Sequence, residues 1–474
     1  MKIKNIQVHQ TIAEAEKLLS EEKNISPALR AIFKLILVLM NTLLGRFNLN
    51  SKNSSKPPSS DPNREKSKKE KSTSARKPGG QPGRIGKQLK PVNTPDEVKI
   101  LTVDRRTLPR GRYQEEGFEA RQVIDFVISI HVIEYRAQIL IGSQGERYVA
   151  EFPDFVTRPV QYGVKTKATA VYMSQYQLIP YQRIEHYFSE QIGLPLSVGA
   201  LFNFNQEAYA LLERFETIAK EKLIGSETIH ADETGINIDG KRFWLHTACN
   251  DLWTHLYPHT KRGHEAMDEI GILPQFKGNL CHDHWKAYYR YGCRHVLCNA
   301  HHLRELKWAE TEEKQKWALI MRKFLIRLNE KVKASGGVLS PEKSRRYRSR
   351  YHRILRCGEK ECPLPERGRE KGTRGRIKKS KSRNLLERLR EYEEDVLRFV
   401  EDKHAPFTNN QGENDLRMTK VQQKISGCFR SLEGALIFCR IRSYLITCRK
   451  HDVSATEALE TLFKGNLPGF VNSG

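Results

Sequence analysis

Residues 226–300 alternate between strand-like and helix-like patterns in an order that few folds share. Three strand-like runs come first, "ETIHADETG", "KRFWLHTACND" and "LWTHLYPHT", with a hairpin turn in "INIDG". A helical segment, "RGHEAMDEIGI", then precedes a strand in "GNLCHDHW", a short helix in "KAYYRYG" and a strand in "RHVLCNA". This is the element order of an RNase H-like fold, so we expect an α/β core of that class.

Such a core would bring together three acids that lie far apart in the sequence. Asp232 lies in the first strand, Asp283 at the end of the fourth, and Glu413 in "NNQGENDLR", at the start of a later helix. Phosphodiester cleavage needs an activated water and a stabilised leaving oxygen, which two Mg²⁺ ions about 3.5–4 Å apart can supply. Mg²⁺ prefers oxygen ligands such as carboxylates. We therefore predict these three acids as catalytic residues and ligands of two Mg²⁺ ions, for which Mn²⁺ can substitute.

The first two acids also have simpler explanations. Asp232 could form a turn at the end of its strand, and Glu233 beside it is a competing ligand. Adjacent strand residues point to opposite faces, so only one of the pair can face the site. Asp283 lies between His282 and His284, which suggests a metal cluster, although such strings are common without one.

Glu413 could likewise serve only the helix dipole, with Asn409 or Asn410 as the N-cap. Three cations follow Glu413 at i+4, i+7 and i+11 and share its helix face. We expect this face to hold a metal at its head and to contact the phosphate backbone through Arg417, Lys420 and Lys424. Asp415 lies about 200° around the helix and is not expected to replace Glu413.

The charge balance indicates a polyanionic partner. The 474 residues carry a formal net charge of +25, which favours nucleic acid. A membrane surface is the rival, but the longest apolar run, residues 35–44, is far shorter than the ~20 residues that span a bilayer. Seven cations and no acid occur between Lys371 and Arg383. We predict further DNA contacts from Arg376, Lys378, Lys379 and Arg430.

The N-terminal region is predicted to be helical over residues 1–50. Ser26 is a suitable N-cap, Pro27 a suitable first helical residue, and Gly45 a suitable stop. Two explanations remain for its apolar stripe, which packs either on another protomer or on its own chain. The stripe consists of Leu29, Ile32, Phe33, Ile36, Met40 and Leu43.

Composition and pattern divide the rest of the chain into further regions. Residues 51–95 are a disordered basic linker, rich in Ser, Pro, Gly and Lys, and residues 96–160 a small β-rich module. Residues 161–225 are a helical DNA-binding region, with a helix-turn-helix as one interpretation and plain helical packing as the other. The core then occupies residues 226–300 and 406–474, with C-terminal helices at its end, and a helical insertion covers residues 301–405.

Cysteine usage and the N-terminus favour the cytoplasm. All nine cysteines lie from Cys249 onward at irregular spacing, which is typical of reduced thiols. The opening "MKIKNIQVHQ" lacks the apolar core of a signal peptide.

Four segments together resemble the transposases of insertion-sequence family 66, the TnpC-type DDE transposases. They are "KPGGQPGRIGK", "HADETG", "NNQGENDLRMTKVQQKISGCFRS" and "IRSYLITCRK". The resemblance implies a retroviral-integrase-like, RNase H-like core with a helical insertion. It also implies Mg²⁺-dependent cleavage of transposon ends and attack of the freed 3′-hydroxyl on target DNA. On the matching motifs, Asp232, Asp283 and Glu413 fall on the catalytic acids of the family.

The chain departs from the family pattern at two places. Members usually carry a cysteine-rich zinc module before the core, but residues 91–160 contain no cysteine, so a thiolate zinc site is excluded there. The residue after the catalytic glutamate is usually Arg and is Asn414 here. Cys298 and His301 in "CNAHH" are only two ligands, which do not make a zinc site. We expect them to support the fold near the active site.

The sequence therefore predicts a DNA transposase of the bacterial cytoplasm and nucleoid. Its partners would be terminal inverted repeats and target DNA, a second copy or larger oligomer, and accessory transposition proteins. Two alternatives stay open. One is a nuclease of the same fold without strand transfer, and the other is a DNA-binding protein without catalysis.

Overall fold

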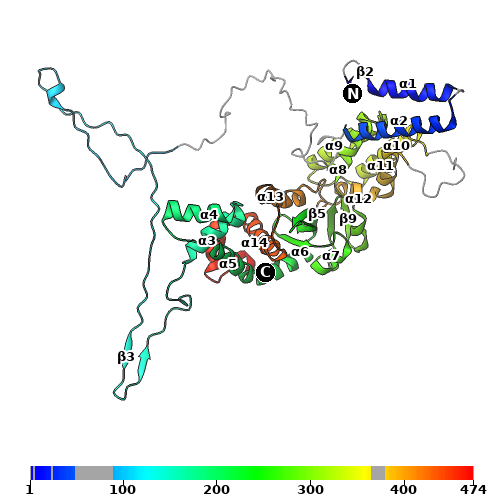
Figure 1. The fold of residues 1–474 in the computed structure, drawn as a ribbon. Coiled ribbons are helices and arrows are strands. Elements are labelled where there is room, and N and C mark those ends of the chain that lie inside the picture. Colours follow the sequence, from blue (N-terminus) through cyan, green and yellow to red (C-terminus); the bar gives the residue numbers. More distant parts are fainter. Residues whose placement is uncertain (1, 4–5, 23–24, 48–88, 365–378, 473–474) are drawn as a thin grey trace.

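A five-stranded mixed sheet forms the centre of the protein (Figure 1). The computed structural model describes residues 2–3, 6–22, 25–47, 89–364 and 379–472. The sheet order is β7-β6-β5-β8-β9; β5, β6 and β7 pair antiparallel, whereas β5, β8 and β9 run parallel. The chain is a mixed α/β protein, and the predicted succession of strands and helices over residues 226–300 is confirmed. The strands are β5 (Thr228–Ile238), β6 (Lys241–Cys249), β7 (Thr254–His259), β8 (Asn279–His282) and β9 (Arg294–Leu297).

Two local sequence features allow the strands to meet. Asp239 and Gly240 have φ of 48° and 74° in the hairpin between β5 and β6, which is the conformation that a two-residue hairpin turn needs. Gly278 lies directly before β8, where a Cβ would be 2.5 Å from the carbonyl oxygen of Glu227. Only glycine therefore lets β8 approach the start of β5 this closely. Helix α7 (His264–Ile270) lies between β7 and β8, and the short helix η5 (Lys286–Arg290) between β8 and β9.

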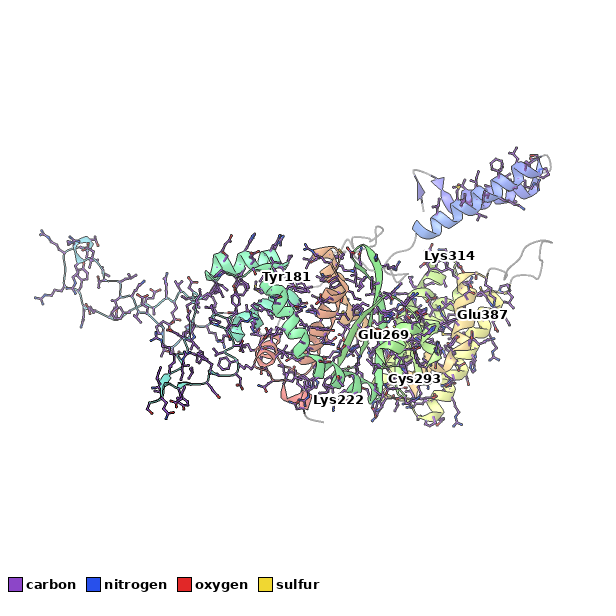
Figure 2. All side chains as sticks on the ribbon, turned by 60° about the horizontal axis from the view of Figure 1, so that its bottom comes forward. Tyr181, Lys222, Glu269, Cys293, Lys314 and Glu387 are labelled. Atoms are coloured by element: carbon purple, nitrogen blue, oxygen red, sulfur yellow. The ribbon has the colours of Figure 1, made fainter. Side chains whose placement is uncertain are left out.

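Helices flank the sheet on two sides (Figure 1). In Figure 2 the labelled side chains follow the same order, from Tyr181, through Glu269 and Cys293 near the sheet, to Glu387. On the first side lie α3 (Val164–Val171), α4 (Tyr181–Tyr187), α5 (Val198–Leu211) and α6 (Glu213–Ile224), with π-helical turns at Tyr172–Tyr176 and Phe188–Ile192. The insertion holds α8 (Asn299–Thr311), α9 (Lys316–Ala334), α10 (Pro341–Glu361), α11 (Lys381–Glu391), α12 (Glu393–Leu397) and the turn Arg398–Val400. The last helices are α13 (Asn410–Ser426), α14 (Leu432–Lys450), α15 (Ala455–Phe463) and α16 (Gly469–Asn472).

Two large apolar clusters join these layers. One holds residues of α3 to α6, the sheet, α14 and α15, including Phe215 and Tyr444. The other continues from Cys281 and Val296 on the sheet into the insertion, where it includes Trp317 and Tyr351. Because each fully buried side chain of this size contributes about 1.5–3 kcal/mol, the insertion and the sheet are held as one body.

A buried ion cluster fastens α6 and α14 to β7. The Glu216 carboxylate, whose side chain is 15% exposed, lies 3.0 Å from His255 Nε2 and accepts a hydrogen bond from Arg440 Nε at 2.6 Å. Burial opposes ionisation of Glu216, but His255, Arg440 and Lys220 outweigh it and lower the pKa of Glu216 to about 2.

We expect Glu216→Gln to destabilise the fold by about 3–5 kcal/mol, because Arg440 is left buried without its counter-charge. The folded pKa of about 2 lies below the ordinary 4.5. The contribution is therefore fully present above pH 4.5 and is lost as the pH falls through about 2. Urea unfolding at pH 7, 4 and 2.5 measures the difference in the free energy of unfolding between the parent protein and Glu216→Gln. The exposed acid Glu213, on the same helix, gives the control Glu213→Gln. An equal loss of stability in both variants would contradict the prediction, as would a loss in Glu216→Gln that stays the same as the pH falls.

The N-terminal helices agree with the sequence at their start but not at their end. α1 (Val8–Glu21) follows the two-residue strands β1 (Lys2–Ile3) and β2 (Ile6–Gln7). In α2 (Pro27–Phe47), Pro27 is the first residue and Ser26 Oγ accepts a hydrogen bond from the N–H of Leu29 at 3.3 Å. The predicted stop at Gly45 is wrong, since a glycine costs only about 1 kcal/mol inside a helix. The six residues of the apolar stripe are 40–56% exposed, and what covers them stays a prediction.

Residues 96–160 differ most from the sequence prediction. They contain only β3 (Ile139–Ile141), β4 (Arg147–Val149) and a short turn at Arg105–Thr107, so the expected richness in β-strands is wrong. Val123, Phe126 and Val127 are 80–97% exposed. Alternating apolar residues form a stable sheet only where neighbouring strands and a second layer cover them, and no cysteine is present to gather the segment around a metal. Most of the basic linker, residues 51–88, lies outside the described residues.

Candidate active site

The register between β5 and β8 brings two of the predicted acids level with each other. His230 of β5 pairs with Cys281 of the parallel strand β8. Asp232 and Asp283 each lie two residues further along. Side chains alternate along strands, so continuing this register sends both carboxylates to the same face.

Asn409 places the start of α13 against this face. The residue is 1% exposed, and its Nδ2 donates to the carbonyl oxygen of Ala231 at 2.9 Å, while its Oδ1 lies 2.8 Å from His230 Nδ1. Its backbone N–H donates to Cys298 Sγ at 3.1 Å. Asn409 occupies the N-cap position but makes no capping bond. The side-chain cap considered from the sequence is wrong for Asn409, because its amide binds β5 instead.

The two ends of α13 fix the position of Glu413 in its first turn. At the N-terminal end, a Cβ on Gly412 would lie 3.5 Å from the Cβ of Asp232, so the helix approaches β5 at this acid. At the C-terminal end, the N–H of Phe429 donates to the carbonyl oxygen of Asn237 at 3.0 Å. Glu413 thus reaches the site from a helix segment that is held to β5 near Asp232 and near Asn237.

The electrostatics of Asp232 reflect the convergence of the acids. Burial, followed by the charges of Glu233, Asp283 and Glu413, raises the pKa of Asp232 well above its ordinary value. Like charges at short range disfavour ionisation. Asp283 and Glu413 therefore both lie close enough to Asp232 to disfavour its ionisation, and all three acids are only partly exposed.

Glu233, the competing ligand, is engaged elsewhere. Its buried carboxylate accepts hydrogen bonds from Arg262 Nε at 2.9 Å and from the Tyr288 hydroxyl at 2.6 Å. Burial and the charge of Asp283 raise the pKa of Glu233, although Tyr288 and Arg262 oppose this shift. Arg262 is itself held between the rings of Trp244 and Trp285. Asp232 is therefore the freer of the two neighbouring acids.

The histidines on either side of Asp283 belong to the protein interior. His282 is fully buried, lies 3.1 Å from His295 Nδ1 through its Nε2, and packs on the ring of Tyr288. His284 packs edge-on against Tyr392, and burial lowers the pKa of His284 to about 4. Neither joins Asp283 in a candidate metal cluster among the described residues.

One group of three potential metal ligands includes Glu413. Atoms of Cys298, His301 and Glu413 lie within 4.8 Å of one another, the only such group among the described residues. His301 Nδ1 is buried without a hydrogen-bond partner, and the charges of Asp283 and Glu413 oppose the lowering of its pKa by burial and Arg304. Arg304 Nη2 lies 3.5 Å from Glu413 Oε1. Glu413 is thus within reach of both the carboxylates and these α8 side chains.

Three of the cations predicted to contact DNA from the α13 segment are exposed: Arg417, Lys424 and Arg430. Lys420 is also exposed but donates to the carbonyl oxygen of Gly235 at 2.5 Å, and burial together with Arg242 lowers the pKa of Lys420. A DNA contact by Lys420 would need this bond to break.

Asp415 and the predicted cations of the insertion have other positions. Asp415 accepts hydrogen bonds from Thr254 Oγ1 at 2.7 Å and Lys450 Nζ at 2.9 Å, which occupies it away from Glu413, as the helix geometry predicts. Lys379 is paired with Glu387 at 2.5 Å and is only 19% exposed. Arg376 and Lys378 lie outside the described residues.

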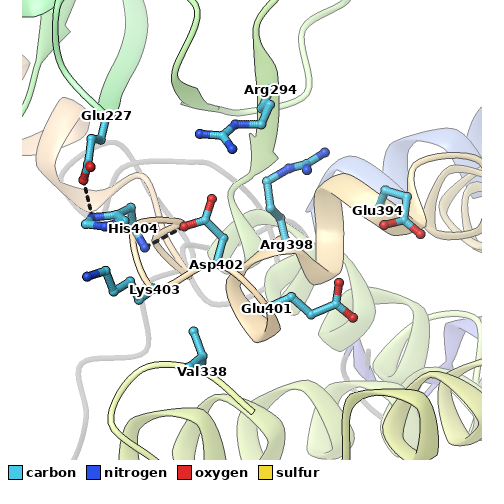
Figure 3. Close-up of a pocket in the computed structure, with 9 residues that line it drawn as sticks. All are labelled: Glu227, Arg294, Val338, Glu394, Arg398, Glu401, Asp402, Lys403 and His404. Atoms are coloured by element: carbon cyan, nitrogen blue, oxygen red, sulfur yellow. Dashed lines mark hydrogen bonds and ion pairs between the residues drawn. The ribbon is translucent and has the colours of Figure 1, made fainter. Parts of the chain in front are cut away.

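A separate cavity of about 580 Å³ lies away from the acids (Figure 3). None of the predicted catalytic or DNA-binding residues lines it. His404 Nδ1 lies 2.7 Å from Glu227, and the His404 N–H donates to Asp402 Oδ1 at 2.9 Å. Four acidic and four basic side chains line the cavity and balance each other, so its charge selects no ligand. They are Glu227, Glu394, Glu401, Asp402, Arg294, Arg398, Lys403 and His404.

Comparison with protein families decides the identity of the chain. The family model described as Transposase IS66 family matches residues 159–436, more than half of the sequence. The chain belongs to this transposase family. A second model, described as a family of unknown function (DUF6444), matches residues 5–90. No curated protein matches the chain. Among the described residues, no helix of this transposase is both long and apolar enough to cross a membrane.

Sequence reasoning about this transposase missed Arg304 and the supporting role of Asn409. Arg304 follows His301 by three residues on α8, so helical spacing places both on one face, a signal that could have found it. Nothing in "TNNQGEN" distinguishes a buried Asn409 that joins three segments from an ordinary cap. All nine cysteines, each within the described residues, are free thiols, as the sequence predicts.

Proposed function

We propose that this transposase cleaves DNA strands at transposon ends and joins the freed 3′-hydroxyl to target DNA, with Asp232, Asp283 and Glu413 holding two Mg²⁺ ions. The observation that carries the proposal is the convergence of these acids. Asp232 and Asp283 follow paired residues of two adjacent parallel strands, and a Cβ on Gly412, the residue before Glu413, would lie 3.5 Å from the Cβ of Asp232. The acids come from positions up to 181 residues apart in the sequence. Fold requirements alone do not favour gathering repelling carboxylates at a partly open site.

The sheet topology supports an RNase H-like core. Numbered along the chain, the five strands stand in the order 3-2-1-4-5, with the first three antiparallel and the last two parallel to the first. The acids then occupy the first strand, the end of the fourth strand and a helix that follows the insertion. This is the arrangement expected for a retroviral-integrase-like catalytic core with a helical insertion.

The side chains at the site fit hard divalent cations. Asp232 and Asp283 offer oxygen atoms from adjacent parallel strands, and Glu413 offers them from α13. Two bound Mg²⁺ ions would supply an activated water and a stabilised leaving oxygen. Carboxylate oxygens also suit Mn²⁺, which we expect to substitute. Arg304 at 3.5 Å orients the Glu413 carboxylate and balances part of its charge before a metal binds.

Exposed cations on the α13 segment would hold the DNA that reaches this site. Arg417 and Lys424 lie on the face of α13 that Glu413 heads, and Arg430 follows the helix. Contacts of this kind with phosphates fix the position of the strand without reading its sequence. The bound backbone would then be led toward the acids.

Cleavage and joining can be tested separately. Purified protein is incubated with DNA that carries the terminal inverted repeats of the element, with Mg²⁺, Mn²⁺ or chelator. We expect strand cleavage only with metal. Pre-cut ends and a supercoiled target then report strand transfer. Cleavage without joining would favour a nuclease, and DNA binding without cleavage in any metal would favour a non-catalytic protein.

A further inference from the structure

Helix α10 presents a row of cations to solvent on the side away from its core. Its buried residues, among them Ser344, Tyr351 and Leu355, pack into the insertion. At about 100° per residue, the opposite side of the helix carries four exposed cations, which we call the α10 stripe. The stripe consists of Arg346, Arg350, Arg353 and Lys360.

The stripe does not serve the fold. No ion pair in the described residues includes any of its four members, and Arg350 alone approaches a ring, that of Phe324 at 5.9 Å. Arg348 on the same helix shows the contrast, since its guanidinium is 19% exposed and pairs with three carboxylates. Like charges at i, i+4 cost about 0.2–0.5 kcal/mol per pair. The helix therefore keeps a repulsive row that no ion pair among the described residues relieves.

The acids of α10 leave the stripe positive. Glu342 is exposed four residues before Arg346 and can offset only one of the four charges. Glu359 pairs with Arg390, and Glu361 accepts a hydrogen bond from the N–H of Trp317 at 2.9 Å. Arg345 and Arg356 are exposed beside the stripe and extend its positive charge. Lys360 lies 14 positions after Arg346, and over that span an α-helix rises roughly 21 Å. A duplex of that length presents about six phosphates on each strand, at 3.4 Å per phosphate.

We propose that the α10 stripe binds the phosphate backbone of double-stranded DNA. This rests on the proposed function, because it assigns a further contact to the DNA on which the transposase acts. A lipid surface is a poorer match, since the exposed residues among the stripe, Ser349 and Cys357, are small and offer no large apolar group to insert.

The fold connects this surface rigidly to the acids. Helix α8 begins beside the site, with His301 and Arg304 near Glu413, and packs on α9, which in turn packs on α10. A single apolar cluster continues from Cys281, two residues before Asp283, to Tyr351 on α10. DNA bound along the stripe would thus be held at a fixed position relative to the scissile phosphate.

The test is the salt dependence of DNA binding by the triple variant Arg346→Gln/Arg350→Gln/Arg353→Gln, in full-length protein without Mg²⁺. Glutamine keeps the helix propensity close to that of arginine. For three lost phosphate contacts, the slope of log K against log [KCl] should fall in magnitude by about 2.7, at roughly 0.9 per phosphate. The matched control Lys277→Gln/Arg449→Gln/Lys464→Gln removes three exposed cations outside the insertion and should leave the slope unchanged.

Each other outcome overturns the proposal. An unchanged slope in the α10 variant, or an equal fall in the control, would show that only overall charge matters. Tighter binding to anionic phosphatidylserine vesicles than to duplex DNA would identify a membrane surface. If the triple variant melts early, Arg353→Glu alone should still weaken binding, and unaltered binding would be decisive against the stripe. If the salt slope of the triple variant is unchanged and the parent protein still cleaves DNA with Mg²⁺, only the role of the stripe is refuted. If the parent protein does not bind DNA, the proposed function is refuted as well.

Discussion

Asp283→Asn is expected to abolish Mg²⁺-dependent cleavage of DNA that carries the transposon ends, while binding of that DNA is kept. The amide removes one anionic oxygen ligand from the site, and its neutral oxygen binds a hard cation less well. We expect a loss of roughly 10³-fold or more, equivalent to about 4 kcal/mol of transition-state stabilisation. Cleavage is measured under single-turnover conditions at saturating Mg²⁺, and binding by mobility shift without metal.

The structure makes this variant a clean test. Asp283 is partly exposed, and its only described hydrogen bond is with the N–H of Trp285, 3.2 Å from its Oδ1, which the asparagine oxygen can still accept. Asp239→Asn, in the exposed hairpin turn, is the matched control, because asparagine tolerates the positive φ of that position. Full cleavage by Asp283→Asn would refute the site assignment, and loss of cleavage in the control would show that the assay reports folding.

Asn409→Ala is expected to lower the cleavage rate by about 10–100-fold, the usual effect of removing a residue that orients a metal ligand. Asn409 touches no reacting atom and is a positioning residue. Its amide contacts His230 and Ala231, the two residues of β5 that precede Asp232, so alanine frees the first turn of α13 from β5. Glu413 should then bind metal less well, and the Mg²⁺ concentration for half-maximal cleavage should rise.

The metal dependence separates positioning from simple loss of fold. Partial unfolding would lower the amount of active protein without changing the Mg²⁺ requirement of the remainder. The control Asn414→Ala alters an exposed residue on the same helix turn and should change neither the rate nor the metal requirement. A reduced rate at an unaltered Mg²⁺ requirement in Asn409→Ala would exclude the positioning role.

Local patterns were sufficient for the strands and for most helices of the core. The run that contains Asp232 alternates β-branched with polar residues and ends at the turn-forming pair Asp239 and Gly240, so its strand could be predicted from the sequence. Residues 96–160 show the same kind of pattern but contain only two strands of three residues each. The difference is that the core strands have neighbours and covering helices, whereas Val123 and Val127 remain exposed. An alternating apolar pattern indicates that a segment can form a strand, but it does not indicate whether a neighbouring strand is present to pair with it.

By itself, the sequence determined the order of elements, the excess positive charge and the choice of Asp232, Asp283 and Glu413, because periodicity and residue chemistry are local properties. Only the tertiary structure decided which side chains remain free to act. Glu233 is hydrogen-bonded to Arg262 and Tyr288, Lys379 is paired with Glu387, and Asp415 is paired with Lys450. Asn409 joins the start of α13 to β5 and to Cys298, and the α10 stripe forms no ion pair within the described residues. These outcomes depend on contacts between residues distant in the chain, which the packing of the whole fold creates and no local pattern contains.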